Sequence, residues 1–271
     1  MSTDNTPFAM VPLPGQRSAK PRTTGITMMM DWGLAYRRAE DYMEVQAPYV
    51  DLVKIVVGTA RLYPEDYLVR KLDMYKSHDV VPFLGGQFSE YVFATQGWDG
   101  MPPFFAEAKR LGFDALEISD NCVPLNDEER ARMIKLAIEH GLEVHGEVGS
   151  KIMHQSADEI VAQAKTCLEA GAEIVLVEGA ELVDDAGKPI IEMIKALRAE
   201  MDLTKTLFEL TGPWIKGVTL DSICQLKLFL LEEFGADVNM ANVMPDEVIE
   251  LEASRVGLSV VGPALAEKVA E

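Results

Sequence analysis

Short apolar runs alternate with longer amphipathic segments along most of this chain. Each apolar run has the length of a buried strand, and the segments between them are long enough for a helix. The runs span residues 25–31, 51–58, 80–86, 113–119, 142–148, 173–179, 206–212 and 237–243. This pattern predicts eight strands joined by helical connections.

Three of the connecting segments carry clear helix signals. The segment that opens at Asn126 has an acidic first turn and stops at Gly141. A second opens at Ser156, has a glutamate three residues later in the manner of a capping box, and stops at Gly171. The third spans residues 189–201. Caps and stops of this kind delimit helices that lead directly into the next strand.

Eight strands with helical connections fit a closed (β/α)8 TIM barrel in both number and chain length. An open doubly wound sheet is the alternative, but no strand is followed by the glycine-rich fingerprint of a dinucleotide site. Residues 1–22 are rich in Pro, Ser and Thr and predict an extended N-terminal arm. We therefore expect the arm to precede a single barrel domain over residues 23–271.

Composition and charge limit the partners and the cellular location that we expect for this protein. The 271 residues carry a net charge of −19 and give an isoelectric point near 4.6, which argues against nucleic-acid and membrane partners. No apolar run is long enough to cross a bilayer, and the N-terminus does not have the form of a signal peptide. Cys122, Cys167 and Cys224 form no zinc or disulfide pattern, so we expect a cytoplasmic protein.

Acidic residues recur near the carboxyl ends of the predicted strands. Glu117, Glu147, Glu178 and Glu209 follow one another at spacings of 30, 31 and 31 residues. In a barrel this rhythm brings four acids to one mouth, which is where barrel active sites lie. A subset of them, with Asp31 at the end of the first strand, would suit Mg²⁺. Pairing with neighbouring lysines or arginines is the structural alternative, and the sequence leaves the choice of ligands open.

Other polar residues on or near the strands are further candidates. Lys54 stands inside an apolar strand, where a lysine is either paired or functional. Lys151 lies on the loop after the fifth strand, and Asn239 and Asn242 lie on the last strand. A buried lysine with a lowered pKa forms Schiff bases, so an aldolase that uses Lys54 or Lys151 is an alternative function.

Several stretches of the chain resemble the phosphosulfolactate synthase family, in order over residues 20–260. They are residues 20–33, 51–60, 83–91, 112–130, 141–151, 174–181, 207–210 and 236–258. The resemblance implies a (β/α)8 barrel that adds sulfite to phosphoenolpyruvate with Mg²⁺ as cofactor. It implies that metal on the substrate carboxylate stabilises an enediolate, which a general acid then protonates.

The same resemblance implies roles for single residues. Lys151 matches the proton donor, and Glu147 would serve the metal region. Arg22 and Lys54 are candidates for gripping the anionic groups of a small carboxylate substrate. Arg61, just past the second strand, is a further candidate from its position alone, and Asn239 and Asn242 complete the predicted substrate-binding set. Barrel enzymes of this kind commonly assemble, so we expect a homo-oligomer.

The chain departs from the family pattern at three strand ends. Trp32 replaces a lysine, Ala180 replaces an arginine, and residues 210–214 read Leu-Thr-Gly-Pro-Trp where the family has Ala-Pro-Gln and often a lysine. Lys216 and Arg61 are candidates to compensate. The loss of cations and the gain of two tryptophans predict a less anionic or more apolar substrate. Some relatives are linked to heat tolerance, so a non-catalytic stress protein is the remaining alternative.

Overall fold

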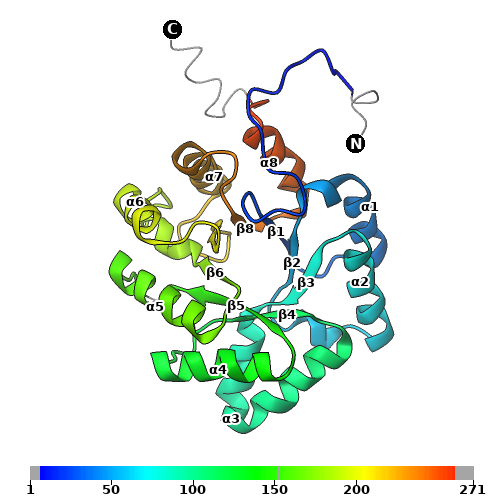
Figure 1. Ribbon diagram of the computed structural model, residues 1–271, viewed down its shortest axis with the longest axis vertical. Helices are drawn as coiled ribbons and strands as arrows, with labels where there is room; N and C mark the ends of the chain where they lie inside the picture. The colour runs from blue at the N-terminus through cyan, green and yellow to red at the C-terminus, as the bar shows by residue number, and fades with distance from the viewer. Residues whose placement is uncertain (1–6, 152, 260–271) are drawn as a thin grey trace.

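A computed structural model describes residues 7–151 and 153–259 of the chain (Figure 1). The predicted arm and barrel domain both extend beyond these limits, since residues 1–6 and 260–271 lie outside the described part. Between residues 7 and 26 the chain forms neither helix nor strand. Over the described residues, no helix is both long and apolar enough to span a membrane.

Eight parallel strands close into a barrel in sequence order, with β1 paired to both β2 and β8. The predicted (β/α)8 fold is therefore confirmed, and every predicted strand is present in shorter form. The strands are β1 (Thr27–Asp31), β2 (Leu52–Ile55), β3 (Val81–Leu84), β4 (Ala115–Ile118), β5 (Glu143–Val148), β6 (Ile174–Val177), β7 (Thr206–Glu209) and β8 (Met240–Val243).

Helices surround the strands on all sides (Figure 1). The capping box that the sequence predicts at Ser156 is present in front of α5, and Asn126, predicted as the start of a helix, also forms a capping box in front of α4. The helices are α1 (Tyr36–Gln46), α2 (Glu65–Ser77), α3 (Gly86–Leu111), α4 (Asp127–Glu139), α5 (Ala157–Ala170), α6 (Ile191–Glu200), α7 (Leu220–Phe234) and α8 (Val248–Arg255). Short 3-10 turns include η3 (Thr59–Leu62) after β2 and η4 (Gly179–Leu182) after β6.

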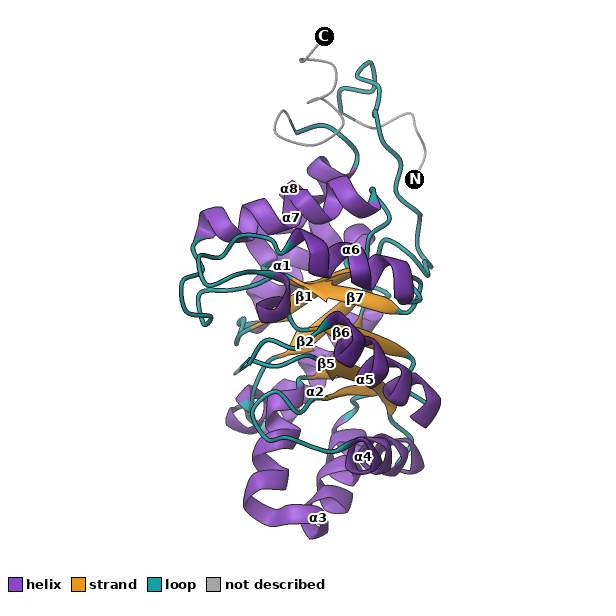
Figure 2. Ribbon diagram, turned by 90° about the vertical axis from the view of Figure 1, so that its left-hand side faces the viewer, coloured by secondary structure: helices purple, strands orange, loops and turns teal. Residues whose placement is uncertain are grey.

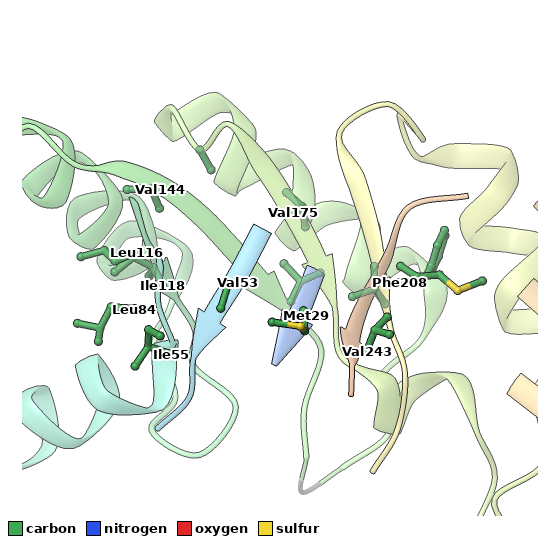
Figure 3. Packing of buried hydrophobic residues seen from close by; sticks show 14 of the residues in the cluster. Met29, Val53, Ile55, Leu84, Leu116, Ile118, Val144, Val175, Phe208 and Val243 are labelled. Atoms are coloured by element: carbon green, nitrogen blue, oxygen red, sulfur yellow. The ribbon is translucent and has the colours of Figure 1, made fainter. Parts of the chain in front are cut away.

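Side chains along each strand alternate between the helices and the barrel interior. Outward residues such as Met29, Val53 and Phe208 belong to the large core cluster between strands and helices (Figure 3). A second cluster holds one or two apolar residues from each of six strands, and residues so distributed can meet only inside the barrel. Its members are Met28, Phe83, Ala115, Ile174, Leu176, Leu207 and Ala241.

The polar face of β5 points into this interior. The His145 ring packs edge-on against Phe83, with ring centroids 4.6 Å apart, and its Nε2 lies 3.2 Å from Glu143 Oε1. Glu147 shares this face two residues further along the strand. The alternation of β5 therefore carries polar side chains up the inside of the barrel to its mouth.

The chain before β1 packs under the opposite end of the barrel and runs beside α8 (Figure 2). Arg17 donates to the Tyr49 carbonyl and forms ion pairs with Asp51 and Glu252. Lys20 Nζ donates to three backbone carbonyls, including that of Val50 at 2.6 Å. These basic side chains fix the arm to the N-terminal ends of the first strands.

Candidate active site at the barrel mouth

Four glutamates from consecutive strands meet at the carboxyl end of the barrel. Glu117, Glu147 and Glu209 are buried, and one carboxylate oxygen of each lies within 4.8 Å of the other two. Glu178 stands beside this group just after β6, where its side chain accepts a hydrogen bond from the Ala180 N–H at 3.1 Å. We call the four residues the strand-end glutamates. Their spacing along the chain is one βα unit, which is why the fold collects them at one mouth.

Lys54 reaches the strand-end glutamates from β2. Its Nζ lies 2.6 Å from Glu117 Oε2 and 3.0 Å from Glu209 Oε1. The lysine inside an apolar strand is thus paired, and it neutralises part of the charge of two carboxylates.

Lys151 approaches the same group from the β5–α5 loop. Its Nζ lies 2.8 Å from Glu178 Oε2 and 3.5 Å from Glu147 Oε1. Each of the two lysines is therefore shared by two carboxylates. Four buried carboxyl groups thus face two ammonium groups. If all four were ionised, the mouth would carry an excess of negative charge.

The pKa values of these groups reflect burial and charge competition. Burial and the neighbouring carboxylates raise the pKa of Glu178 to about 8, against the opposing effect of Lys151. Burial and Glu147 raise the pKa of Glu117 well above its usual range. Burial alone would raise the pKa of Glu147 as well, but Lys151 and Lys54 hold it below its ordinary value. The cluster therefore retains protons at neutral pH that a bound cation could replace.

The donors at the mouth suit a hard divalent cation. Carboxylate oxygens of Glu117, Glu147 and Glu209 lie close together, and oxygen ligands of this kind are those that Mg²⁺ prefers. Asn242 lines the same cavity, and its buried Oδ1 has no hydrogen-bond partner among the described residues. A buried oxygen without a partner calls for a ligand or an ordered water. The residues present thus fit the predicted Mg²⁺.

A cavity of about 200 Å³ opens above the carboxylates. Met30, Lys54, Lys151 and Asn242 contribute to its wall, together with Glu117, Glu147 and Glu209. Trp32, which follows β1, and Trp214, on the β7–α7 connection, line the same cavity with their ring centroids 5.4 Å apart. Residues that the sequence marks as departures from the family pattern therefore border the site directly.

Two contributors escaped the sequence analysis. The Gly86 N–H donates to Glu117 Oε1 at 2.8 Å, and a side chain on Gly86 would press against that carboxylate. Glu181, fully buried in η4, accepts from the backbone N–H groups of Ser150 at 2.8 Å and Gln155 at 3.0 Å. The sequence features that mark these two positions are the paired glycines after an apolar strand and an acid inside an apolar stretch.

Asp31 does not join the strand-end glutamates. Its side chain points outward from β1, toward the helices. In the strand register Asp31 pairs with Ile55, whereas Met30 pairs with Lys54, which points into the barrel. Its carboxylate is held by Lys71 Nζ at 2.6 Å and by the Tyr75 hydroxyl at 2.7 Å, both from α2. The prediction of Asp31 as a metal ligand therefore fails on geometry, because a strand end alone does not say which way the side chain points.

Arg22 and Asn239 lie at the other end of the barrel. Arg22 pairs with Asp51 at 3.1 Å, just before β2. The Asn239 side chain accepts from the Ile26 N–H and donates to the Thr206 carbonyl, at the starts of β1 and β7. These two predicted substrate-binding residues are thus far from the mouth, and their contacts are structural.

Arg61 is exposed in η3 and lines a different cavity, of about 520 Å³. This larger cavity lies between α2 and α3 and is bordered by side chains such as Leu68 and Phe104. It contains none of the strand-end glutamates. Of the predicted substrate-binding residues, the structure brings only Lys54 and Asn242 to the acidic cavity.

Comparisons with solved structures find the same barrel fold in other proteins. The YdjI aldolase from Escherichia coli K12 superimposes with a TM-score of 0.52 at 14% identity, over 92% of this chain and 91% of that one. The 3-hexulose-6-phosphate synthase from Salmonella typhimurium gives 0.51 at 14% identity, over 89% and 99%. At such low identity these likenesses show the (β/α)8 fold alone.

Sequence comparisons are more specific. The model of the family described as (2R)-phospho-3-sulfolactate synthase (ComA) matches residues 15–260. The phosphosulfolactate synthase of Methanothermobacter thermautotrophicus is 33% identical over 252 residues, which cover 89% of this chain and 92% of that protein. That of Methanocaldococcus jannaschii is 34% identical over 253 residues, covering 86% and 92%. The chain belongs to the phosphosulfolactate synthase family, and with it to the lyase type of enzyme.

A plant relative is more distant. The Arabidopsis thaliana protein named heat-stress-associated 32 is 23% identical over 266 residues, which cover 88% of each chain. A chain with this fold is thus also related to a protein whose name refers to stress rather than to a reaction.

Proposed function

We propose that this protein is a Mg²⁺-dependent lyase that joins a sulfur nucleophile, such as sulfite, to the terminal carbon of phosphoenolpyruvate or a related 2-substituted acrylate. The observation that carries the proposal is Lys151 at the cavity, held between Glu178 and Glu147 beside the close group of carboxylate oxygens. Membership of the family supports the reaction type. A cytoplasmic location, a homo-oligomeric assembly and the lack of nucleic-acid or membrane partners stay predictions.

The reaction needs positive charge and one proton. Attack of sulfur on C3 moves the electron pair of the double bond toward the carboxylate and forms an enediolate. Mg²⁺, held by Glu117, Glu147 and Glu209, would supply the positive charge that stabilises this species. Lys54 stays between Glu117 and Glu209 and orients both carboxylates toward the cavity.

Lys151 is the proposed proton donor to C2. Burial alone would lower the pKa of Lys151, but Glu147 and Glu178 raise it above its ordinary value, so the amine is protonated before the transfer. The new C–H bond at C2 completes the addition and leaves Lys151 neutral. Glu178, with its pKa raised to about 8, carries a proton near neutral pH and lies 2.8 Å from Lys151 Nζ, where it can return that proton.

The alternatives are less well supported. A Schiff-base lysine must be neutral to attack a carbonyl, so its pKa must be lowered. Lys54 and Lys151 both have raised pKa values, because burial is outweighed by the carboxylates around them. For a non-catalytic stress protein we would expect a filled barrel mouth, but this mouth holds a cavity of about 200 Å³.

The test is a product assay on the full chain with sulfite, Mg²⁺ and a panel of 2-substituted acrylates that includes phosphoenolpyruvate. Mass spectrometry should detect a sulfonate product, and Lys151→Ala should lower its rate by about 10²–10⁴-fold, as loss of a general acid does. Lys165→Ala, on the exposed face of α5, is the matched control and should keep the full rate. Absence of product across the panel, from folded protein that binds Mg²⁺, would overturn the proposal.

A further inference from the structure

Trp32 stands on a turn that a buried carboxylate holds in place. Asp31 Oδ1 accepts from the N–H groups of Gly33 at 2.9 Å and Leu34 at 2.8 Å. Gly33 has φ +107°, a conformation that glycine adopts freely. Asp31 is itself held by an ion pair with Lys71 from α2. The turn that carries Trp32 is therefore fixed to the barrel.

The Trp214 ring packs against the backbone of its own loop at Gly212. The ring lies so close to Gly212 that any side chain at position 212 would overlap the ring. The two tryptophan rings are tilted by 45° to each other, with centroids 5.4 Å apart. Two loops that are distant in sequence therefore build one aromatic surface at the rim of the acidic cavity. We call Trp32 and Trp214 the tryptophan pair.

The tryptophan pair remains open to a ligand. Trp32 is 43% exposed and Trp214 is 38% exposed. Large exposed aromatic side chains that gather at a cavity are typical of a site where a ligand or partner covers apolar surface. Because the rings border the cavity that Glu117, Glu147 and Glu209 line, the covering group belongs to the molecule that enters that cavity.

In the part of the chain that the structure describes, the wall of the same cavity has two basic side chains, Lys54 and Lys151, and neither is uncommitted. Lys54 is shared by Glu117 and Glu209, and Lys151 by Glu147 and Glu178. A phosphate ester would bring further negative charge next to these carboxylates without a free guanidinium or ammonium to receive it.

We propose that the tryptophan pair binds a flat, uncharged substituent of the substrate, at the position where phosphoenolpyruvate carries its phosphate. The substrate class is then a small 2-substituted acrylate with an apolar group on C2. This inference rests on the proposed function, which places the carboxylate end of the substrate at the acidic floor. A cavity of about 200 Å³ restricts the substituent to a single small ring or branched group.

A cationic substituent is the competing possibility. Trimethylammonium groups stack on tryptophan, and an acidic floor would add attraction. Each strand-end glutamate, however, already faces a lysine, and Mg²⁺ would neutralise the remainder. The neutral group is therefore favoured, and the charge of the ligand becomes the variable that the experiment must separate.

Calorimetric titration of the Mg²⁺-saturated full chain tests the inference without turnover. We expect 2-phenylacrylate to bind about tenfold more tightly than phosphoenolpyruvate. Trp32→Ala and Trp214→Ala should each weaken 2-phenylacrylate by about tenfold and leave phosphoenolpyruvate within about twofold. Trp98→Ala is the matched control, because Trp98 packs against Phe93 and Arg132 away from the cavity. Circular dichroism of each variant confirms its fold.

Three results would overturn the inference. Phosphoenolpyruvate could bind more tightly than 2-phenylacrylate, or the two tryptophan variants could weaken both ligands equally. Alternatively, choline could bind more tightly than its neutral isostere 3,3-dimethylbutanol, which would assign the tryptophan pair to a cation. Failure of the proposed function looks different: tryptophan-dependent binding of 2-phenylacrylate would persist while sulfite adds to no acrylate.

Discussion

The two ends of the barrel both bury charged side chains, but they resolve the cost of burial in different ways. At the N-terminal end, Arg17, Lys20 and Arg255 donate to backbone carbonyls that the strands and loops leave free. At the mouth, the strand-end glutamates face one another and share two lysines. Burial of charge is expensive at either end unless each group finds a partner.

The pKa shifts reflect this difference. Burial and the nearby Arg17 lower the pKa of Arg255 to about 9, which indicates an excess of positive charge at the N-terminal end. At the mouth, burial raises the pKa of Glu178 to about 8 against the opposing effect of Lys151, and the negative charge of Glu209 and Glu147 adds to the rise. The N-terminal end satisfies its excess with carbonyl dipoles of the chain itself. At the mouth, the two lysines neutralise only part of the excess negative charge. The rest of that charge is available to bind a ligand.

We expect the largest effect from a substitution at the N-terminal end of the barrel, where groups of the chain itself pair with the buried charges. Arg17→Met removes a buried guanidinium and leaves Glu252 without its cation, while Asp51 keeps its ion pair with Arg22. We expect the free energy of unfolding to fall by about 3–5 kcal/mol, as when one partner of a buried pair is removed. Urea denaturation followed by circular dichroism measures it.

Arg38→Met is the matched control for this change. Arg38 pairs with Asp246 on the surface, where both side chains are mostly exposed, so its loss should leave the denaturation midpoint unchanged. If Arg17→Met behaved like Arg38→Met, the N-terminal end would contribute no more to stability than any surface ion pair. The two ends would then not differ in how they stabilise buried charge.

The mouth was predictable from sequence because the βα unit repeats. A glutamate every thirty or so residues at a strand end needs only the closed barrel to bring the four together. Asp31 shows the limit of this reasoning, since it ends a strand like the others but points outward to Lys71. Asn239 shows a second limit: β8 begins at Met240, so Asn239 stands before the start of its strand rather than near its end.

The tryptophan pair and the loop contacts were beyond such reasoning. Trp32 and Trp214 are separated by most of the chain, and only the closure of β1 near β7 and β8 brings their loops together. Glu181 stands out in the sequence as an acid inside an apolar stretch, but nothing there shows that its carboxylate binds the backbone N–H groups of Ser150 and Gln155. Residues that act through the backbone, or through pairs of loops, therefore need the folded structure to be found.

Glu181 offers the next test, because it positions the loop that carries Lys151. Its carboxylate accepts from Ser150 and Gln155, on either side of Lys151. A glutamine at this position can accept with its oxygen only, and its NH₂ group faces the second donor. Steady-state kinetics of the sulfite addition should show kcat reduced by about 10–100-fold in Glu181→Gln, with little change in KM.

Glu169→Gln, on the exposed side of α5, serves as the control and should retain kcat. A purely structural role for Glu181 would lower the melting temperature but leave kcat of the folded fraction intact. That outcome would remove Glu181 from the machinery of the mouth and would leave Lys151 positioned by its two carboxylates alone.

The smallest effect concerns the pH dependence of Mg²⁺ binding. Glu178 has a pKa raised to about 8 by burial and neighbouring carboxylates, so it is protonated at pH 6 and ionised at pH 9. Ionisation adds negative charge beside Glu117, Glu147 and Glu209, and a cation competes with the proton for it. The affinity for Mg²⁺ should therefore rise with pH, by about tenfold in total between pH 6 and 9.

Calorimetric titration with Mg²⁺ at several pH values measures this rise, and Glu178→Gln should flatten it by removing the titrating group. Ca²⁺ added in place of Mg²⁺ should show the same direction, because the effect depends on charge rather than on coordination geometry. An affinity that stays constant or falls as the pH rises would mean that the excess charge at the mouth is already neutralised within the chain. The mouth would then resolve its buried charge as the N-terminal end does, and the proposed metal site would lose its physical basis.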